Sequence, residues 1–558
     1  MSDTWWKAAV IYQIYPSSFK DTNGDGWGDL PGIISKVDYL KNLGVDILWI
    51  SPIYKSPQAD MGYDIADYKL IDPIYGTNED IDVLVAELKK RDMKLMMDLV
   101  VNHTSNEHAW FVDSISSKSS PKRSWYIWKD PAGSDSNGDP LPPNNWCQLL
   151  GDANSAWTYD PESKQFYLSL FTPEQPDLNW ETPEVRAAVH DAMRFWLDKG
   201  VCGYRMDVIN LISKDQRFPD APVTNDGGKA KYHPGSKWYT NGPRMHEFLR
   251  EVKREVLAPY KAVTVGEMPG VSDPDEVLKT VHQGDGELSM IFIFDVVDVD
   301  FVPGEGRLAL RPFKTGDWVK DVVKWQRVMW ERDGWNSVFI ENHDNPRSVS
   351  RYCDDSDEWR EKGAKLLALM QTTLSGTIFV YQGEEIGVRN MPKYWDGVLD
   401  KKARDHARTP MHWDGSPHGG FCGKDVKPWM RVMDDYVTFN VDVQTNSNSD
   451  DDLSIWQYWQ RGLSNRKAHA DAFVHGEFQS VDNAEGDDVF AYLKVGKESG
   501  TWVIVLNFSG DEVQWRMPSN VKVQGWVAGN YLKGKPDKPT EGTIGLRPFE
   551  GLLGRSAA

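Results

Sequence analysis

Several acidic residues of this 558-residue sequence stand at or just beyond the ends of apolar runs. Asp207, Glu267 and Asp344 each end or follow such a run, and Asp98 lies within another. One carboxylate of such a set can attack a sugar carbon while a protonated second one donates to the leaving oxygen. Like charges and burial both disfavour ionised acids, so bringing these carboxylates together costs free energy. Such a cost is expected only where the acids have a function. The set predicts hydrolysis of a glycosidic bond; the alternative is that each acid only caps a helix or pairs with an arginine.

The elements that must position these acids are short apolar runs, each followed by polar residues and often by a helical pattern. Such runs are typical of strands buried on both faces of a parallel sheet. Residues from Asn78 onward and from Thr182 to Gly200 show the 3.6-residue period of amphipathic helices. Strands alternating with helices predict an α/β fold, a (β/α)8 TIM barrel, whose active site lies at the carboxyl ends of the strands. The expected strands are 9–16, 45–53, 94–102, 203–209, 263–268, 289–295, 337–342 and 377–385.

Two stretches break this alternation, so we expect three domains. Residues 104–172 are rich in Ser, Pro, Asn and Trp and fall between the third strand and its helix, which predicts a small inserted domain, domain B. Residues 473–558 contain the alternating runs of a C-terminal antiparallel β-sandwich, domain C. Residues 1–103 and 173–472 then form the catalytic barrel, domain A.

The composition excludes several classes of partner. Lys and Arg total 63 against 83 Asp and Glu, a net charge of −20, which disfavours binding to nucleic acid. The sequence has no apolar run of 18 residues and no signal peptide, so we expect no membrane contact and a cytoplasmic protein. The four cysteines are widely spaced, which favours free thiols over one chance disulfide. We expect a monomer or weak homo-oligomer that acts on a small-molecule oligosaccharide.

Motifs around the acids resemble the conserved segments of the α-amylase superfamily of glycoside hydrolases. The likeness covers nearly the whole chain, and two further motifs narrow it to oligo-1,6-glucosidases, isomaltases and maltases. The four general motifs are DLVVNH (98–103), GYRMDVIN (203–210), TVGEMPG (264–270) and ENHDNPR (341–347). The two narrower motifs are QPDLNW (175–180) and ARDHARTPMHW (403–413).

The resemblance implies a retaining, exo-acting α-glucosidase. Asp207 would be the nucleophile, Glu267 the general acid/base, and Asp344 the residue that stabilises the transition state. Arg205 stands two residues before Asp207, hence on the same face of a strand, and is expected to keep that carboxylate ionised.

The resemblance also implies a set of substrate-binding residues. An Asp–Arg pair would recognise the terminal glucose, with Asp60 and Arg404 at the matching positions and Arg408 as the alternative arginine. Tyr63 would stack on the sugar, although core packing is the alternative for Tyr63 and for Phe171. The remaining expected contacts are His103, Phe171, Gln175 and His343.

Val208, directly after the expected nucleophile, bears on linkage preference. In this family a valine there accompanies α-1,6-glucosidic substrates and a threonine accompanies α-1,4 substrates. The exchange keeps shape but replaces a methyl group by a hydroxyl beside the leaving group. We therefore expect a preference for isomaltose-type linkages, including those of sucrose isomers; the alternative is a neutral β-branched strand residue.

Oxygen-bearing residues alternate in the segment that follows the first strand, and they suit calcium. The segment is not an EF-hand, because Gly32 occupies the twelfth position, where a glutamate would be needed. The resemblance implies a structural Ca²⁺ site, against the alternative of a turn that holds no metal, and no organic cofactor. The implied ligands are Asp21, Asn23, Asp25, the Trp27 carbonyl and Asp29.

The sequence departs from the family at two places. Only 16 residues (388–403) separate Gly387 from Arg404, fewer than in relatives, so we expect an open leaving-group side. That would permit a transglycosylating α-glucosidase. Sucrose isomerases carry an arginine-rich stretch after the sixth strand, whereas residues 294–304 contain no arginine, which disfavours a sucrose isomerase-like glucosyl transferase. All three catalytic acids are present, which argues against a non-catalytic transporter subunit or sugar-binding module.

Overall fold

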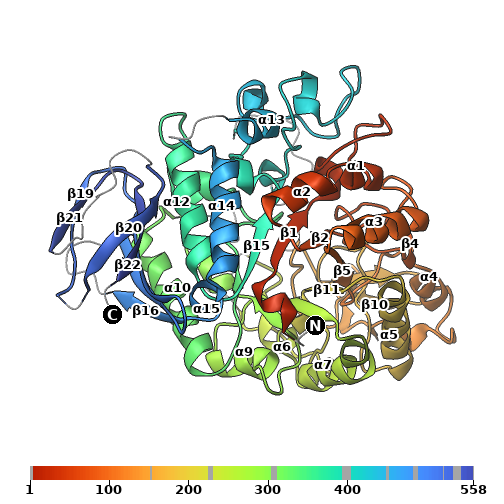
Figure 1. Ribbon diagram of the computed structural model, residues 1–558. Coiled ribbons are helices and arrows are strands. Elements are labelled where there is room, and N and C mark those ends of the chain that lie inside the picture. The colour runs from red at the N-terminus through yellow and green to blue at the C-terminus, as the bar shows by residue number, and fades with distance from the viewer. Residues whose placement is uncertain are drawn as a thin grey trace.

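Eight parallel strands form the central barrel of the protein (Figure 1). Hydrogen-bonded neighbours follow the order β13-β12-β11-β5-β2-β1-β15-β14. The Ser337 hydroxyl on β14 donates to the Ile291 carbonyl on β13 at 2.7 Å and so joins the two end strands of that order. The strands are β1 (Val10–Ile14), β2 (Ile47–Ile50), β5 (Lys94–Val100), β11 (Gly203–Asp207), β12 (Val263–Glu267), β13 (Met290–Phe292), β14 (Ser337–Val338) and β15 (Thr377–Tyr381). The computed structural model describes residues 4–150, 154–223, 230–302, 311–392, 404–447, 452–481, 488–519, 521–531 and 542–556.

Helices surround the barrel and begin and end where their sequence signals stand. Thr77 and Asp80 form a reciprocal capping box at the start of α3, and Pro183 occupies the first turn of α5. Gly200, two residues after α5, has φ +101°, a conformation that favours glycine. The alternation of strands and helices confirms the predicted barrel. The helices are α1 (Leu30–Ser35), α2 (Val37–Leu43), α3 (Asn78–Lys90), α4 (Ala109–Ser116), α5 (Pro183–Asp198), α6 (Ser236–Tyr239), α7 (Met245–Val252), α8 (Ala258–Tyr260), α9 (Pro274–Val281), α10 (Thr315–Glu331), α11 (Ser348–Tyr352), α12 (Arg360–Thr373), α13 (Val441–Thr445), α14 (Ile455–Ala468) and α15 (Ala470–Phe473).

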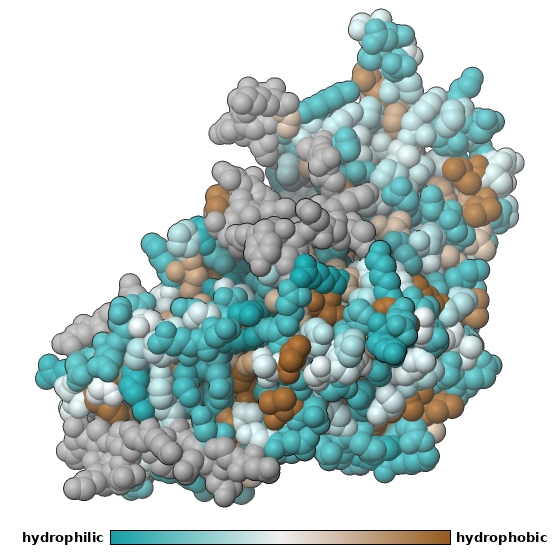
Figure 2. All heavy atoms as spheres, turned by 90° about the horizontal axis from the view of Figure 1, so that it is seen from above, coloured by the Kyte–Doolittle hydropathy of each residue, from teal (hydrophilic) through white to brown (hydrophobic). Residues whose placement is uncertain are grey.

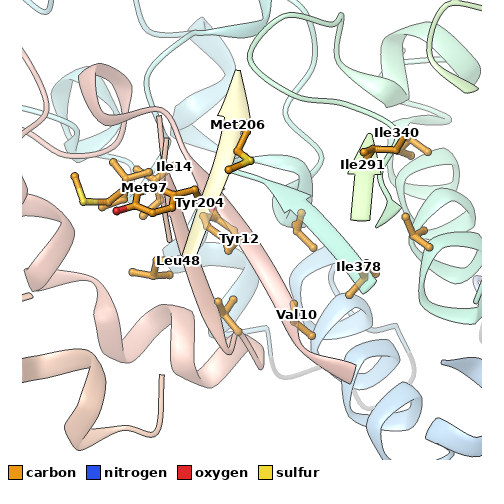
Figure 3. Close-up of a cluster of buried hydrophobic side chains, with 14 of the residues drawn as sticks. Val10, Tyr12, Ile14, Leu48, Met97, Tyr204, Met206, Ile291, Ile340 and Ile378 are labelled. Atoms are coloured by element: carbon orange, nitrogen blue, oxygen red, sulfur yellow. The ribbon is translucent and has the colours of Figure 1, made fainter. Parts of the chain in front are cut away.

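Side chains along each barrel strand alternate between two apolar layers. On β1, Val10, Tyr12 and Ile14 belong to the cluster between sheet and helices, part of which Figure 3 shows. Ile11 belongs to the separate cluster of the barrel interior, together with Trp49. Because successive strand residues point to opposite faces, this period of two decides which residues enter the barrel.

Polar residues replace apolar ones on the inner face toward the carboxyl ends of the strands. Asp98 follows the inward-facing Met96 by two residues, and Glu267 follows Val265 in the same way. In the β5–β11 register Arg205 stands opposite Asp98. The barrel therefore has an apolar layer below and a charged layer above.

Between β5 and α5 the chain forms a small antiparallel sheet in the order β6-β10-β9. Isolated bridges between His103 and Asp177 and between Tyr126 and Leu178 tie its two ends to the barrel rim. The insertion also contains the β7–β8 pair, and a separate β3–β4 pair follows β2. The bounds are β3 (Tyr54–Lys55), β4 (Asp67–Ile71), β6 (Trp128–Lys129), β7 (Gly133–Ser134), β8 (Pro140–Leu141), β9 (Trp157–Asp160) and β10 (Gln165–Leu168).

The C-terminal strands form two antiparallel sheets beside α12 and α14 (Figure 1, blue). A five-stranded sheet has the order β16-β17-β18-β22-β20, and β19 pairs with β21. Side chains of both sheets, among them Val505 and Trp515, share one apolar core, as in a sandwich. The strands are β16 (Glu477–Val481), β17 (Val489–Gly496), β18 (Gly500–Asn507), β19 (Val513–Arg516), β20 (Val523–Gly529), β21 (Thr543–Leu546) and β22 (Gly551–Ser556).

The molecular face in Figure 2 is mostly hydrophilic, with hydrophobic residues in small separate groups. Within the described ranges, no helix has both the length and the apolar character that a membrane crossing requires. All four cysteines are free.

Arg466 of α14 connects the ends of several helices and strands beneath the barrel. It is 1% exposed, and Nη1 donates to the carbonyls of Thr372, Leu374 and Phe473 at 3.1, 2.7 and 2.8 Å. Nη2 donates to the carbonyl of Gly376. These acceptors lie at the end of α12, the start of β15 and the end of α15, so one guanidinium satisfies groups that no helix or ladder pairs.

We predict that Arg466→Met lowers the free energy of unfolding by at least about 3 kcal/mol, because it leaves several buried carbonyls unpaired. Urea denaturation followed by circular dichroism measures this loss. Arg461→Met, on an exposed position of the same helix, is the matched control and should change stability by no more than about 0.5 kcal/mol. Equal effects of the two substitutions would contradict the role of Arg466.

Candidate active site

One buried guanidinium connects the acids at the carboxyl ends of three strands. Arg205 on β11 is 1% exposed. Its Nη1 donates to Asp98 Oδ1 at 3.0 Å and to Asp207 Oδ1 at 2.8 Å, and its Nη2 donates to Glu267 Oε2 at 2.7 Å. The structure thus brings Asp98, Asp207 and Glu267 together around a single cation.

Three carboxylates around one cation leave an excess of negative charge in a buried place. Burial raises the pKa of Asp98 to about 6 and raises the pKa of Asp207 well above its usual range. Arg205 opposes both rises, and the neighbouring Glu267 adds to them. The titrations of Asp98 and Asp207 are therefore coupled, because both carboxylates contact the same guanidinium. A carboxylate pair that shares one proton supplies both a nucleophile and an acid.

His343 and Tyr63 form the wall between these acids and Asp344. The two rings are stacked, with centroids 5.4 Å apart, and His343 Nε2 lies 2.7 Å from the Tyr63 hydroxyl. Nε2 also lies 3.5 Å from Asp344 Oδ2, and the Tyr63 hydroxyl lies 3.4 Å from Asp98 Oδ2. Burial lowers the pKa of His343 to about 3, so this imidazole is neutral.

A second charge cluster holds Asp344 and Asp60. Arg404 donates from Nη2 to Asp60 Oδ1 at 2.8 Å and from Nη1 to Asp344 Oδ1 at 3.1 Å. Arg408 donates to Asp344 Oδ1 at 2.9 Å and to the carbonyl of His343 at 2.7 Å. Arg404 therefore joins the two acids, as the Asp–Arg expectation requires, while Arg408 supports Asp344 from behind.

Residues at and next to the two junctions between the barrel and the inserted domain contribute the opposite wall. Gln175 Nε2 donates to Asp60 Oδ2 at 3.1 Å and lies 3.1 Å from His103 Nε2. The rings of His103 and Phe171 are 4.9 Å apart. Burial lowers the pKa of His103, which keeps this imidazole neutral as well. These contacts fix Asp60 from the side that Arg404 does not reach.

A cavity of about 720 Å³ opens over the acids. Gln175, Arg205 and His343 are buried behind its wall, where they orient the lining groups. Its other side is lined by apolar residues, including Leu211, Tyr239 and Met391. The expected site residues that line it are Asp60, Tyr63, His103, Phe171, Asp207, Val208, Glu267, Asp344 and Arg404.

Residues 13–476 match the family described as "Alpha amylase, catalytic domain". The chain belongs to the alpha-amylase family of glycoside hydrolases. It is 46% identical to an alpha-glucosidase of Schizosaccharomyces pombe, over 98% of this chain and 97% of that protein. It is 43% identical to an oligo-1,6-glucosidase of Parageobacillus thermoglucosidasius, over 99% and 98%.

Among solved structures, the isomaltulose synthase of Erwinia rhapontici is similar, with a TM-score of 0.91 and 37% identity over 100% of this chain and 99% of that chain. These likenesses extend from end to end of the described fold, so the barrel, the insertion and the sandwich all belong to the shared architecture.

Val208 occupies a strained position within this alpha-amylase-family barrel. Its φ is +33°, in the left-handed region that β-branched residues rarely adopt, and its side chain lines the cavity. The strain turns the chain directly after Asp207, so that Val208 N donates to Glu267 Oε2 at 3.3 Å. Val208, the residue after Asp207, thus contacts both the cavity and Glu267.

The sequence did not lead us to every residue that the structure places here. Trp49 Nε1 donates to Asp98 Oδ2 at 3.2 Å, and Gln13 Nε2 lies 2.8 Å from His343 Nδ1. The sequence signal that could have identified Gln13 is its position as a polar residue inside the apolar run 9–16. The apolar residues opposite the acids come from short helical turns and the segment before residue 393, and they carry no such signal. Residues 393–403, most of the shortened segment before Arg404, lie outside the described residues.

The loop before α1 carries the expected calcium ligands. Asp21 and Asp25 each accept two hydrogen bonds from the loop itself, which leaves acceptor capacity on both. Asp29 accepts four, including Gly32 N as the cap of α1, and this fills its lone-pair positions. In the part of the chain that the structure describes, no group of three or more His, Cys, Asp or Glu side chains is placed to hold a metal. Calcium binding stays a prediction, and Asp29 fits a cap better than a ligand.

Proposed function

We propose that this protein is a retaining, exo-acting α-glucosidase that releases terminal α-linked glucose and prefers α-1,6 linkages. The observation that carries the proposal is Arg205, which holds Asp207 and Glu267 at one end of the cavity. The alpha-glucosidase and oligo-1,6-glucosidase names of the relatives support the same activity.

In the first step Glu267 gives its proton to the glycosidic oxygen while the Asp207 carboxylate attacks the anomeric carbon. The bond to the leaving group breaks, and a covalent glucosyl ester forms on Asp207. In the second step Glu267, now ionised, takes a proton from water, whose oxygen attacks the same carbon and displaces Asp207. Two inversions give a product of the same anomeric configuration as the substrate.

The second charge cluster supports exo action. Arg404 and Asp60 lie at the cavity wall, and Asp344 presents its carboxylate between them and His343. Charged groups fixed by ion pairs bind sugar hydroxyls in defined directions. We assign recognition of the terminal glucose to this cluster, with Tyr63 and Phe171 as the apolar surfaces.

The roles of the two acids predict different kinetics with p-nitrophenyl α-glucoside. Asp207→Asn should lower kcat on the order of 10⁴-fold or more and give no nitrophenol burst, because no covalent ester can form. Glu267→Gln should still give a burst, since nitrophenolate leaves without a proton, and should then stall for lack of a base. Stopped-flow absorbance measures both.

A burst from Asp207→Asn, or release of β-glucose by the wild-type protein in NMR, would contradict the mechanism. An isomaltulose synthase is among the similar structures. Product analysis at high substrate therefore separates hydrolysis from transfer, because transfer yields oligosaccharides or sucrose isomers faster than free glucose.

We propose that Val208 sets the linkage preference, because its side chain lines the cavity beside both acids. Val208→Thr should lower the ratio of kcat/KM for isomaltose to kcat/KM for maltose by about tenfold, since it adds a hydroxyl at nearly constant volume. Val208→Ala, which changes volume without polarity, is the control and should shift the ratio less. Initial rates on both sugars measure the effect, and an unchanged ratio in Val208→Thr would contradict it.

We propose that Asp21, Asn23, Asp25 and the Trp27 carbonyl bind a structural Ca²⁺, for which their oxygens are suitable donors. Saturating Ca²⁺ should raise the melting temperature of the wild type, by about 2.7 kcal/mol of stabilisation at a hundredfold excess over Kd. Asp25→Asn should abolish this rise, and Asp135→Asn, in an exposed loop, should not. A wild-type melting temperature that is indifferent to Ca²⁺ and to EDTA would favour the metal-free turn.

The free thiols support a reducing, cytoplasmic environment as our proposal for location. The scattered hydrophobic groups of the face in Figure 2 support a monomer or weak homo-oligomer.

A further inference from the structure

Gln13 places an amide group beneath the acids of the site. It lies on β1, is 2% exposed, and points into the barrel on the same face as Ile11. Its Nε2 lies 2.8 Å from His343 Nδ1 and donates to Ser51 Oγ at 3.2 Å. Gln13 does not line the cavity, and His343 is the partner that connects it to the residues of the site.

The direction of the hydrogen bonds around His343 follows from the groups at both ends. An amide nitrogen can only donate, so His343 Nδ1 accepts from Gln13. A neutral imidazole then carries its proton on Nε2, which faces the acceptor Asp344 and the Tyr63 hydroxyl. Because the Tyr63 oxygen accepts from Nε2, its own proton is free to point at Asp98 Oδ2.

We propose that Gln13 is a positioning residue that sets the direction of a hydrogen-bonded chain running from Gln13 through His343 and Tyr63 to Asp98. Asp98 in turn accepts from Arg205, which holds Asp207 and Glu267. The chain keeps a donor aimed at Asp98 and thereby favours its ionised form, which anchors the guanidinium. This inference rests on the proposed function and adds a residue to it.

The effect on pH dependence has a defined sign. Asp98 is buried with a pKa of about 6, and Arg205, Trp49, Tyr63, Asp207 and Glu267 face it. Loss of the Tyr63 donor raises the pKa of Asp98 further, because a hydrogen bond to the charged form is removed. Activity that needs ionised Asp98 is then lost at a higher pH as the solution is acidified.

His343 has its own charged surroundings, which the same experiment must leave unchanged. Asp344, Arg205, Arg404 and Arg408 are the charged groups that act on this imidazole. Gln13 is itself uncharged, so Gln13→Met alters the direction of the hydrogen-bonded chain without removing a charge.

The test is Gln13→Met, which keeps the length of the side chain but cannot donate. We expect the acidic limb of the kcat/KM profile to move to higher pH, and kcat/KM at its optimum to fall on the order of tenfold, the equivalent of one lost hydrogen bond. Gln13→Glu, whose carboxylate accepts from Nδ1–H when ionised, should move the limb in the same direction. Gln326→Met, at a buried glutamine bonded to Ser375, is the matched control and should leave the profile unchanged.

A double-mutant cycle with Tyr63→Phe shows whether Gln13 acts through the chain. In the Tyr63→Phe background, Gln13→Met should cause no further shift of the acidic limb, because the donor to Asp98 is already gone. The inference would be overturned if the shifts of the acidic limb were additive in the double mutant, or if Gln13→Met left the acidic limb unchanged.

A readout that does not use activity separates this inference from the proposed function. The imidazole ¹⁵N shifts of His343, assigned with His343→Gln, should show Nε2 protonated in the wild type and a mixture of tautomers in Gln13→Met. If Nδ1 is the protonated nitrogen in the wild type, the inference fails even where glucosidase activity is present. If glucosidase activity is absent while the tautomer is as expected, the proposed function fails, but the inferred hydrogen-bonded chain from Gln13 to Asp98 is still supported.

Discussion

A single buried guanidinium must satisfy three carboxylates, and this constraint decides what surrounds it. Arg205 is almost without solvent contact, so its charge must be compensated by neighbouring groups, and it forms ion pairs with Asp98, Asp207 and Glu267. Removing Arg205 would leave three buried carboxylates without their shared cation, which is far costlier than a broken surface pair. The three strands that carry the acids are neighbours in the sheet, and their register keeps the acids at the height of the guanidinium. The barrel order and the chemistry therefore depend on the same contacts.

The charged layer is tolerated because an apolar layer lies directly beneath it. Trp49 and Phe292 lie 5.6 Å apart inside the barrel, and Phe292 and Phe379 lie 4.8 Å apart. These rings exclude water from below, so the site is open only on the cavity side. A low dielectric strengthens the ion pairs of Arg205, and it also raises the pKa of each acid that loses its partner. Stability and reactivity of the site thus follow from one feature, the change from apolar to charged residues along each strand.

Much of this arrangement could be predicted from the sequence, because strand runs and the period of two are local properties. The runs ending near Asp207 and Glu267 are strands β11 and β12, and the helix expected from Asn78 is α3. What the sequence could not reveal is which side chain contacts the cavity and which stands behind it. His343 and Gln175 were among the expected sugar contacts, and the structure places both side chains behind the cavity wall. That distinction depends on the packing of distant segments.

The Asp60–Arg404 contact is the clearest example of what the sequence alone could not reveal, because 344 positions along the chain separate the two residues. A sequence motif can identify both residues as candidates, but only the closed barrel brings them together, with Arg404 also donating to Asp344. Bringing such distant residues together costs the entropy of closing the intervening chain. The end of the cavity at Asp60 and Arg404 is therefore complete only where β15 is paired with β1 and Arg404 reaches Asp60. The acids on β11 and β12, by contrast, are paired by neighbouring strands. The two charge clusters consequently differ in what they require of the fold: the first needs a correct register, and the second needs the complete barrel.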